Sequence, residues 1–278
     1  MSGKTWLRIF SATLGIPTLR HYTQDAADKE LRFNWCKLLF RAGHRLNYPQ
    51  EATATAIILF HRWLIREPLQ PHIPQRDLVL TTCLFLAGKV EEVPRRLRDV
   101  INVVHRLTAV DKNALPPLDQ AYWDMKGKMV ECEQVVLRTI AFGTEAPHPY
   151  RLLLAYSDAM GLDRATKLLA WGMLNDFLFV PAALTLRPQV LACAAIHMAM
   201  EVQAGAANGA KAADKDEPGA GQEGAAMKVE SQTREGSAHV LPGHWWKEFD
   251  VEEKALKQAC HCLLDLYQDE AFQKVDHR

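Results

Sequence analysis

The chain has no excess of charge of either sign. Its 278 residues contain 33 Lys and Arg against 33 Asp and Glu, which gives a formal net charge of zero at pH 7. Proteins whose main task is to grip nucleic-acid phosphates carry a basic surplus, so direct nucleic-acid binding is not expected. No apolar run reaches the roughly 20 residues of a membrane-spanning helix. Residues 1–10 also lack the apolar core of a secretory signal. The sequence therefore predicts an intracellular protein with no membrane partner.

Cysteine is scarce, and its spacing does not suit a metal. Four of the six cysteines stand singly inside apolar helical patterns: Cys36, Cys83, Cys132 and Cys193. That placement is typical of buried free thiols. The other two, Cys260 and Cys262, are separated by one histidine and lack the two-residue spacing of a zinc knuckle. No metal and no other cofactor is expected.

Catalytic motifs are missing as well. The sequence contains no Gly-rich phosphate loop, no His-Glu-x-x-His zinc motif, no Gly-x-Ser-x-Gly elbow and no protein-kinase signature. Glu91 and Glu92 are paired carboxylates, but neighbours on a helix point about 100° apart and cannot act on one substrate bond. A solvated helix end is their expected role. The chain is therefore not expected to be an enzyme.

Convincing alternation of apolar and polar residues is also absent, which indicates an all-α fold. Prolines divide the first half of the chain into helical segments, because proline interrupts a helix and restricts the residue before it. Helices are expected over residues 31–46, 49–66, 74–93, 97–106 and 118–140. Beyond Pro147 and Pro149 the pattern recurs more weakly. There the expected helices are 150–160, 164–179, 188–202 and 247–267.

One segment departs from the helical pattern. From Ala204 to about Ala238 the chain is rich in Ala, Gly, Lys, Asp, Glu and Gln and has no aromatic residue. Such a stretch buries too little apolar surface to offset its ordering entropy, so a disordered loop is predicted. It is either a neutral expansion of a surface loop or a regulatory element with modifiable Ser231, Thr233 and Ser237.

The most informative stretch is Leu-Ala-Gly-Lys-Val-Glu-Glu at residues 86–92. It ends an apolar run that begins at Leu78, and such a run indicates the buried stripe of a helix. A lysine at the end of that stripe, Lys89, needs a partner for its charge. The small residues Ala87 and Gly88 beside it let another backbone come close. Ion-pairable charge at a close-approach surface indicates a site that grips another protein chain.

This stretch resembles the third helix of the cyclin box. The string Glu-Gln-Val-Val-Leu-Arg-Thr-Ile-Ala-Phe at residues 133–142 resembles the fifth, and Arg-Asp-Val-Ile-Asn-Val-Val at residues 98–104 resembles the fourth helix of transcriptional cyclins. Within the cyclin family the chain most resembles the cyclin Q type, which shares the strings at residues 86–92 and 98–103 and a late Trp-Trp pair. The likeness covers roughly residues 31–270, apart from the low-complexity insertion.

The resemblance implies an all-α protein of two tandem five-helix cyclin folds. It implies an N-terminal extension over residues 1–30, a first cyclin box over 31–146 and a second, degenerate cyclin-like fold over 147–278. The low-complexity insertion at about 204–238 interrupts the second fold. The implied function is a regulatory subunit that binds and activates a cyclin-dependent protein kinase as a heterodimer, in the cell cycle or in transcription. The implied location is the nucleus, with the cytoplasm as a second location.

The resemblance also implies which residues contact the kinase. Lys89 and Glu133 match the pair that joins the third and fifth helices and then hydrogen-bonds backbone groups near the kinase C-helix. Leu137 and Phe142 match positions that pack against the C-helix, with internal core positions as the alternative. Val90 stands where the family often has a larger aromatic residue. The smaller side chain reduces the contact area or matches a different kinase surface.

Two other functions stay open. A transcription factor of the TFIIB type also uses tandem cyclin folds, but it would carry a Cys-x-x-Cys zinc ribbon and a basic surface, which this sequence lacks. A scaffold that keeps the fold without activating a kinase is opposed by Lys89 and Glu133 and favoured by Val90 and the expanded loop.

The cyclin Q likeness implies the tenth cyclin-dependent kinase, or its equivalent, as partner. A transcription-type kinase acting on the polymerase C-terminal repeat is the alternative.

Overall fold

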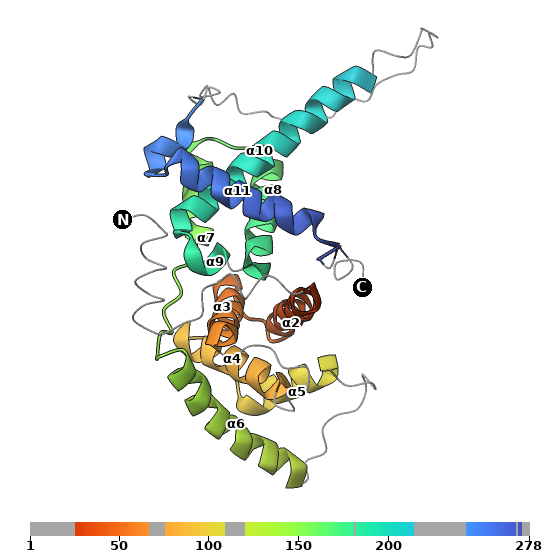
Figure 1. Cartoon of the computed structure of the whole chain (residues 1–278), viewed down its shortest axis with the longest axis vertical. Coiled ribbons are helices and arrows are strands. Elements are labelled where there is room, and N and C mark those ends of the chain that lie inside the picture. Colours follow the sequence, from red (N-terminus) through yellow and green to blue (C-terminus); the bar gives the residue numbers. More distant parts are fainter. Residues whose placement is uncertain are drawn as a thin grey trace, which may run out of the picture. The chain divides into compact units, whose positions relative to one another are not determined.

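The computed structural model of the chain describes residues 26–66, 76–108, 120–180, 182–213, 243–270 and 272–273. Every regular element in these ranges is a helix, and they contain no strand. The prediction of an all-α protein is therefore confirmed. Figure 1 shows the helices coloured along the sequence.

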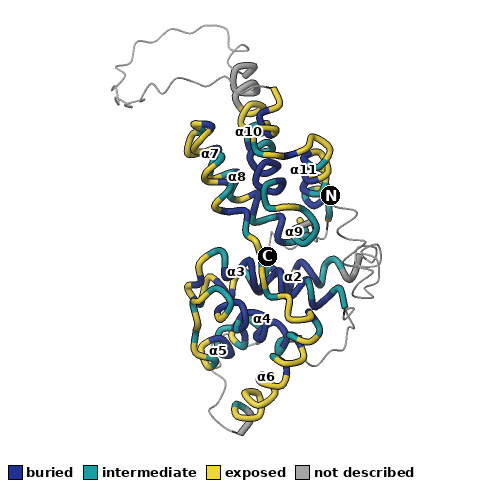
Figure 2. The backbone as a smooth tube through the Cα atoms, turned by 90° about the vertical axis from the view of Figure 1, so that its left-hand side faces the viewer, coloured by how far each residue is buried: buried dark blue, intermediate teal, exposed yellow. Residues whose placement is uncertain are grey.

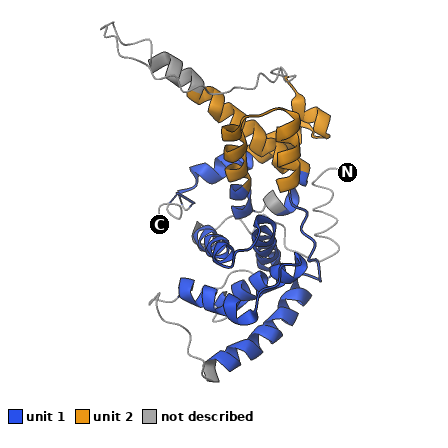
Figure 3. Cartoon of the chain, turned by 180° about the vertical axis from the view of Figure 1, so that it is seen from behind, with its two compact units in different colours: residues 1–148, 175–188, 261–278 blue, residues 149–174, 189–260 orange. Residues whose placement is uncertain are grey.

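The chain forms two compact units, drawn in separate colours in Figure 3. Unit 1 comprises residues 1–148, 175–188 and 261–278, and unit 2 comprises residues 149–174 and 189–260. The chain thus leaves unit 1 after His148 and later contributes two further segments to it. The domain boundaries implied by the cyclin resemblance remain a prediction.

Unit 1 contains the five helices expected for the first box. They are α2 (Ala26–Arg45), α3 (Gln50–Arg66), α4 (Arg76–Val90), α5 (Leu97–Thr108) and α6 (Gln120–Thr139). Helix α3 follows Pro49, and α4 ends before Pro94, as the proline positions predict. Helix α2 begins before the predicted residue 31 because the preceding Ala-Ala-Asp-Lys-Glu stretch consists largely of good helix formers.

Helix α3 is the central element of unit 1. Its residues from Ala52 to His61 are all buried, together with Trp63 and Leu64. A helix buried on all sides needs small or apolar residues on all sides, and the sequence of α3 supplies them. The helix packs against α2, α4 and α6. Its burial therefore gives the neighbouring helices a common support.

Unit 2 is built from α7 (Tyr150–Ala159), most of α8 (Arg164–Asp176), most of α10 (Pro188–Ala213), η2 (Trp245–Phe249) and the first half of α11 (Glu253–Gln268). The intervening η1 (Phe177–Phe179) and α9 (Ala182–Thr185) belong to unit 1. Trp245 and Trp246 are buried, and the Trp246 ring meets His197 of α10 edge-on at 5.6 Å between centroids. This late Trp-Trp pair thus forms part of the core of unit 2.

The predicted start of the disordered loop, Ala204, lies inside a helix. Helix α10 continues to Ala213, so residues 204–213 are helical rather than irregular. This stretch is rich in alanine, which has the highest helix propensity of any residue, and it prolongs a helix that is already nucleated in the core of unit 2. The remainder of the predicted loop, including Ser231, Thr233 and Ser237, lies outside the described residues.

The helix predicted over residues 247–267 is divided in two. The 3-10 helix η2 ends at Phe249, Asp250 has a left-handed backbone with φ of 55°, and α11 begins at Glu253. Aspartate tolerates the left-handed conformation better than most residues do, which allows the break at this position. The apolar periodicity of the sequence continues across Asp250, so the prediction from periodicity did not include this break.

Candidate functional site

Lys89 and Glu133 form an ion pair between α4 and α6. The distance from Lys89 Nζ to Glu133 Oε1 is 2.5 Å, and the two side chains keep 45% and 20% of their surface exposed. The Lys89 ammonium also lies 4.4 Å from the centroid of the Phe85 ring, at the distance of a cation–π contact. The pairing implied by the cyclin resemblance is present. Its exposure leaves both charged groups accessible to another chain.

Gly88 fixes how the end of α4 packs. A Cβ atom at this position would lie 2.3 Å from the hydroxyl oxygen of Tyr48. The Tyr48 hydroxyl in turn donates a hydrogen bond to the carbonyl oxygen of Leu84, at 3.3 Å. Gly88 therefore admits a tyrosine side chain of the same unit, and not the second backbone that the sequence suggested. The packing sets the position of the next residue, Lys89.

The residues just after Lys89 are also held in place. The Thr55 hydroxyl of α3 donates to Glu91 Oε1 at 2.6 Å, and His148 Nε2 lies 2.7 Å from the same hydroxyl oxygen. Because the only hydroxyl proton goes to Glu91, the His148 ring acts as the donor to Thr55. Burial lowers the pKa of His148, although Glu91 opposes the shift. Glu91 is thus bound to α3, so the predicted solvated helix end is wrong for Glu91, whereas Glu92 is exposed as predicted.

Leu137 and Phe142 lie at the C-terminal end of α6. The Leu137 side chain is half-buried, whereas Phe142 is 68% exposed. The alternative of an internal core position is therefore wrong for Phe142. Val90, the last residue of α4, is half-buried beside Lys89. The structure thus places Lys89, Val90 and Glu133 at paired helices and Phe142 on the turn that follows α6.

Sequence reasoning missed further apolar residues on α6. Trp123 is 57% exposed and Val130 52% exposed, and Figure 2 shows α6 as exposed over much of its length. Trp123, Val130 and Leu137 are spaced by seven residues, so they lie on one face of the helix. Glu133 lies one turn beyond Val130 on the same side. The seven-residue spacing was the signal that could have revealed this stripe.

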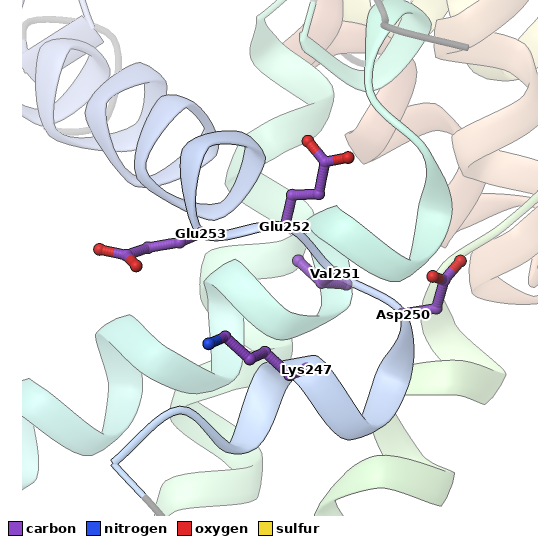
Figure 4. Close-up of a pocket in the computed structure, with 5 residues that line it drawn as sticks. All are labelled: Lys247, Asp250, Val251, Glu252 and Glu253. Atoms are coloured by element: carbon purple, nitrogen blue, oxygen red, sulfur yellow. The ribbon is translucent and has the colours of Figure 1, made fainter.

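The pocket drawn in Figure 4 lies apart from these residues in the sequence. It is a hollow of about 320 Å³ in unit 2, lined by Lys247, Asp250, Val251, Glu252 and Glu253. Figure 4 shows the three carboxylates pointing in different directions, so they do not converge on one point. Across the described ranges, no cluster of His, Cys, Asp and Glu is arranged to hold a metal ion. In the same ranges, no helix combines the length and apolarity needed to span a membrane.

The cysteines are free thiols. Cys36, Cys83, Cys132 and Cys193 are buried, as predicted. Burial raises the pKa of Cys36 to about 12, so its thiolate is scarce at neutral pH. The buried thiols therefore act as small apolar core residues.

Comparison with known families identifies the N-terminal part of the chain. Residues 13–145 match the cyclin N-terminal domain family, and this range includes α2 to α6 with Lys89, Glu133, Leu137 and Phe142. The likeness to a cyclin N-terminal domain therefore covers the helices that carry the ion pair. The resemblance to the cyclin family is confirmed.

Several curated proteins that are similar to most of the chain are cyclins of the L type. The chain is 28% identical to human Cyclin-L1 over 256 residues, which are 90% of this chain and 42% of that protein. It is 33% identical to Cyclin-L1 of Gallus gallus over the same shares, and 29% identical to human Cyclin-L2 over 94% of this chain and 44% of that protein. The chain thus spans less than half the length of these relatives. The particular likeness to the cyclin Q type remains a prediction.

Two solved structures with a similar fold come from kinase complexes. A chain of the yeast RNA Pol II CTD kinase CTDK-1 complex matches 91% of this chain with a TM-score of 0.63 and 18% identity, over 68% of its own length. A chain of the CAK complex from Chaetomium thermophilum bound to ATP-gamma-S matches 90% with a TM-score of 0.54 and 17% identity, over 66% of its length. At such identities the likeness concerns the fold. It extends over both units and agrees with the predicted all-α cyclin fold.

Proposed function

We propose that this chain is a regulatory cyclin subunit that binds and activates a cyclin-dependent protein serine/threonine kinase. One observation carries the proposal: the exposed Lys89–Glu133 ion pair, joined at 2.5 Å between α4 and α6 of a cyclin N-terminal domain. An exposed ion pair contributes little to folding, typically about 0–1 kcal/mol. Phe85 lies beside Lys89, Val90 follows it at the end of α4, and Leu137 lies one turn beyond Glu133 on α6, and such apolar neighbours suit a surface that another protein covers.

The mechanism is positional. In an inactive kinase the C-helix is displaced, so the lysine–glutamate pair that orients the ATP phosphates is not formed. A rigid helical surface that binds the inward position of the C-helix shifts the kinase toward its active conformation. Lys89 and Glu133 would hydrogen-bond backbone groups near the C-helix, and Val90, Leu137 and Phe142 would pack against its apolar side chains. The cyclin itself performs no chemistry in this proposal.

The proposed partner is a kinase linked to transcription, and the proposed location is the nucleus. Support comes from the relatives, which are cyclins of the L type, and from the fold shared with chains of an RNA Pol II CTD kinase complex and a CAK complex. The tenth cyclin-dependent kinase, implied by the cyclin Q likeness, is the second candidate. The zero net charge of the chain gives no support to a direct role in binding DNA.

The test is an affinity capture from cell extract. Tagged wild-type protein and Lys89→Glu are compared, bound proteins are identified by mass spectrometry, and the bound fraction is assayed for kinase activity. Lys167→Glu is the matched control, because Lys167 pairs with Asp158 at 2.6 Å in unit 2. Lys167→Glu also reverses the charge of one lysine in an exposed ion pair, but it lies away from the proposed site.

We expect an active kinase with wild type and with Lys167→Glu, and its loss with Lys89→Glu. Removing one partner of a desolvated interface pair typically costs about 2–5 kcal/mol of binding free energy, which is enough for this loss. Capture of no kinase by any variant would contradict the activator function and leave a scaffold function as the alternative. Equal capture by wild type and Lys89→Glu would move the contact away from Lys89.

A further inference from the structure

We infer that Arg62 is a positioning residue, which holds the turn after α6 in the conformation that presents Phe142 to the partner. Arg62 lies on the central helix α3, and its Nη1 atom donates a hydrogen bond of 2.5 Å to the carbonyl oxygen of Gly143. The inference rests on the proposed function for its consequence in kinase binding. The conformational part can be tested on this chain alone.

The turn after α6 has an uncommon backbone. Ala141 and Phe142 are both left-handed, with φ of 53° and 57°. Residues other than glycine rarely adopt this region, and such strained conformations persist only where the surrounding structure holds them. Two of them in succession therefore require support from outside the turn.

The hydrogen bonds within the turn come from its own chain segment. Phe142 N donates to Leu137 O at 2.8 Å, and Gly143 N donates to Ile140 O at 3.1 Å. Such bonds close a helix end, as they do after many helices. They do not tie the turn to the rest of unit 1. The bond from Arg62 joins it to another element.

The Arg62 guanidinium is suited to this role. Its side chain is half-buried, and burial lowers its pKa while the Glu145 carboxylate, two residues beyond Gly143, opposes that shift. An arginine remains charged in a protein, and a charged donor makes a stronger hydrogen bond to a carbonyl oxygen than a neutral one does. Arg62 thus meets the turn with both a hydrogen bond and a favourable charge.

The conformation of this turn decides in which direction the Phe142 side chain leaves the backbone. With 68% of its surface exposed, the Phe142 side chain is not held by packing within the unit. The backbone to which it is attached sets the direction of its Cα–Cβ bond, and thereby the region that the ring can reach. A residue that fixes this backbone therefore keeps Phe142 on the side of the partner, and a fixed turn reduces the entropy that is lost on binding.

The same face of α3 also holds the segment that follows Lys89 and Val90. Thr55 precedes Arg62 by seven residues, so both side chains lie on one face of the helix, two turns apart. Thr55 binds Glu91, which directly follows the end of α4. One helix thus holds the segment after Lys89 and Val90 through Thr55 and the segment after Leu137 through Arg62.

The first test measures hydrogen–deuterium exchange in the isolated chain. Arg62→Met removes the donors and keeps much of the apolar stem, and Arg62→Lys retains one charged donor. We expect amide exchange at residues 142–144 to be about tenfold faster in Arg62→Met, with a smaller rise in Arg62→Lys, while α3 stays protected. Arg106→Met, at an exposed position on α5, is the control and should change nothing at the turn. Unchanged exchange in Arg62→Met would overturn the inference.

The second test is a double-mutant cycle on the affinity for the kinase recovered in the capture experiment. We expect Arg62→Met and Phe142→Ala each to weaken binding about tenfold. The affinity of the double variant should be no lower than that of the single variant that binds less tightly. Arg62→Met combined with Glu133→Gln should instead be additive. Additive losses for Arg62 and Phe142 would overturn the positioning role. If no kinase binds wild type, the proposed function fails while the exchange result still decides the role of Arg62 in the turn.

Discussion

The hydroxyl oxygen of Tyr48 occupies the space that any side chain at position 88 would need. A Cβ atom on Gly88 would approach this oxygen to 2.3 Å, well inside van der Waals contact. Tyr48 is itself buried, and Arg95 lies 5.4 Å from its ring centroid. The tyrosine therefore has little room to retreat. The end of α4, and with it Lys89, takes its position from this contact.

Gly88→Ala is expected to lower the free energy of unfolding by about 1–3 kcal/mol, because overpacking forces the helix or the Tyr48 ring to move. Chemical denaturation measures the loss. Gly127→Ala on α6 is the matched control, since no atom beyond its chain neighbours and the backbone of its own helix lies within 4 Å of the added Cβ. There the higher helix propensity of alanine should stabilise the protein by up to about 1 kcal/mol. Equal stability of the two variants would contradict the packing explanation.

Reversing the charged pair should separate folding from binding. In the double variant Lys89→Glu/Glu133→Lys, the two side chains can still pair, so thermal unfolding should stay close to that of wild type. Kinase capture should remain lost, because donor and acceptor have exchanged places relative to the partner backbone. Recovery of capture by the double variant would indicate that the pair supports only the fold.

Two valines on α6 offer a matched comparison for the exposed stripe. Val130 is 52% and Val135 54% exposed, and they point to sides of the helix about 140° apart. Val130→Glu should weaken kinase binding severely, because it places a charge beside Glu133 in the proposed interface, whereas Val135→Glu should have little effect. Binding is measured by titration of the captured kinase. Equal effects of the two variants would exclude the stripe as part of the interface.

His61 should make unit 1 sensitive to acid. Its ring is fully buried, Nε2 lies 2.7 Å from the carbonyl oxygen of Leu178, and burial lowers the pKa to about 4. The unfolded chain binds this proton near pH 6.5, so stability is complete above about pH 6.5 and falls as the pH drops toward about 4. The expected loss is about 3 kcal/mol.

Urea denaturation at several pH values between about 7.5 and about 4 measures this loss. His61→Gln keeps a donor for Leu178 but does not titrate, so its stability should depend less on pH over the same range. The lowered pKa of His148 adds a dependence of the same sign, and this part should remain in the variant. The same pH dependence in wild type and His61→Gln would show that His61 is not responsible.

Much of unit 1 could be predicted because its signals are local. Helices α3 and α4 follow from apolar runs bounded by prolines, and the relation of Lys89 to Glu133 followed from the resemblance of two short strings. The role of Gly88 was predicted only in part. A glycine indicates that another group comes close, but it does not identify that group. In the structure the group is the side chain of Tyr48, forty residues earlier in the chain.

The sequence by itself determined the all-α character and helices α2 to α6 of unit 1, together with the residues that form the charged pair. These features depend on apolar periodicity, on proline and on residue strings, which are properties of neighbouring residues. Only the tertiary structure decided that Glu91 binds Thr55, that Phe142 projects from a left-handed turn and that Arg62 holds that turn. Contacts between residues far apart in the sequence depend on how the helices pack, and no local pattern encodes them.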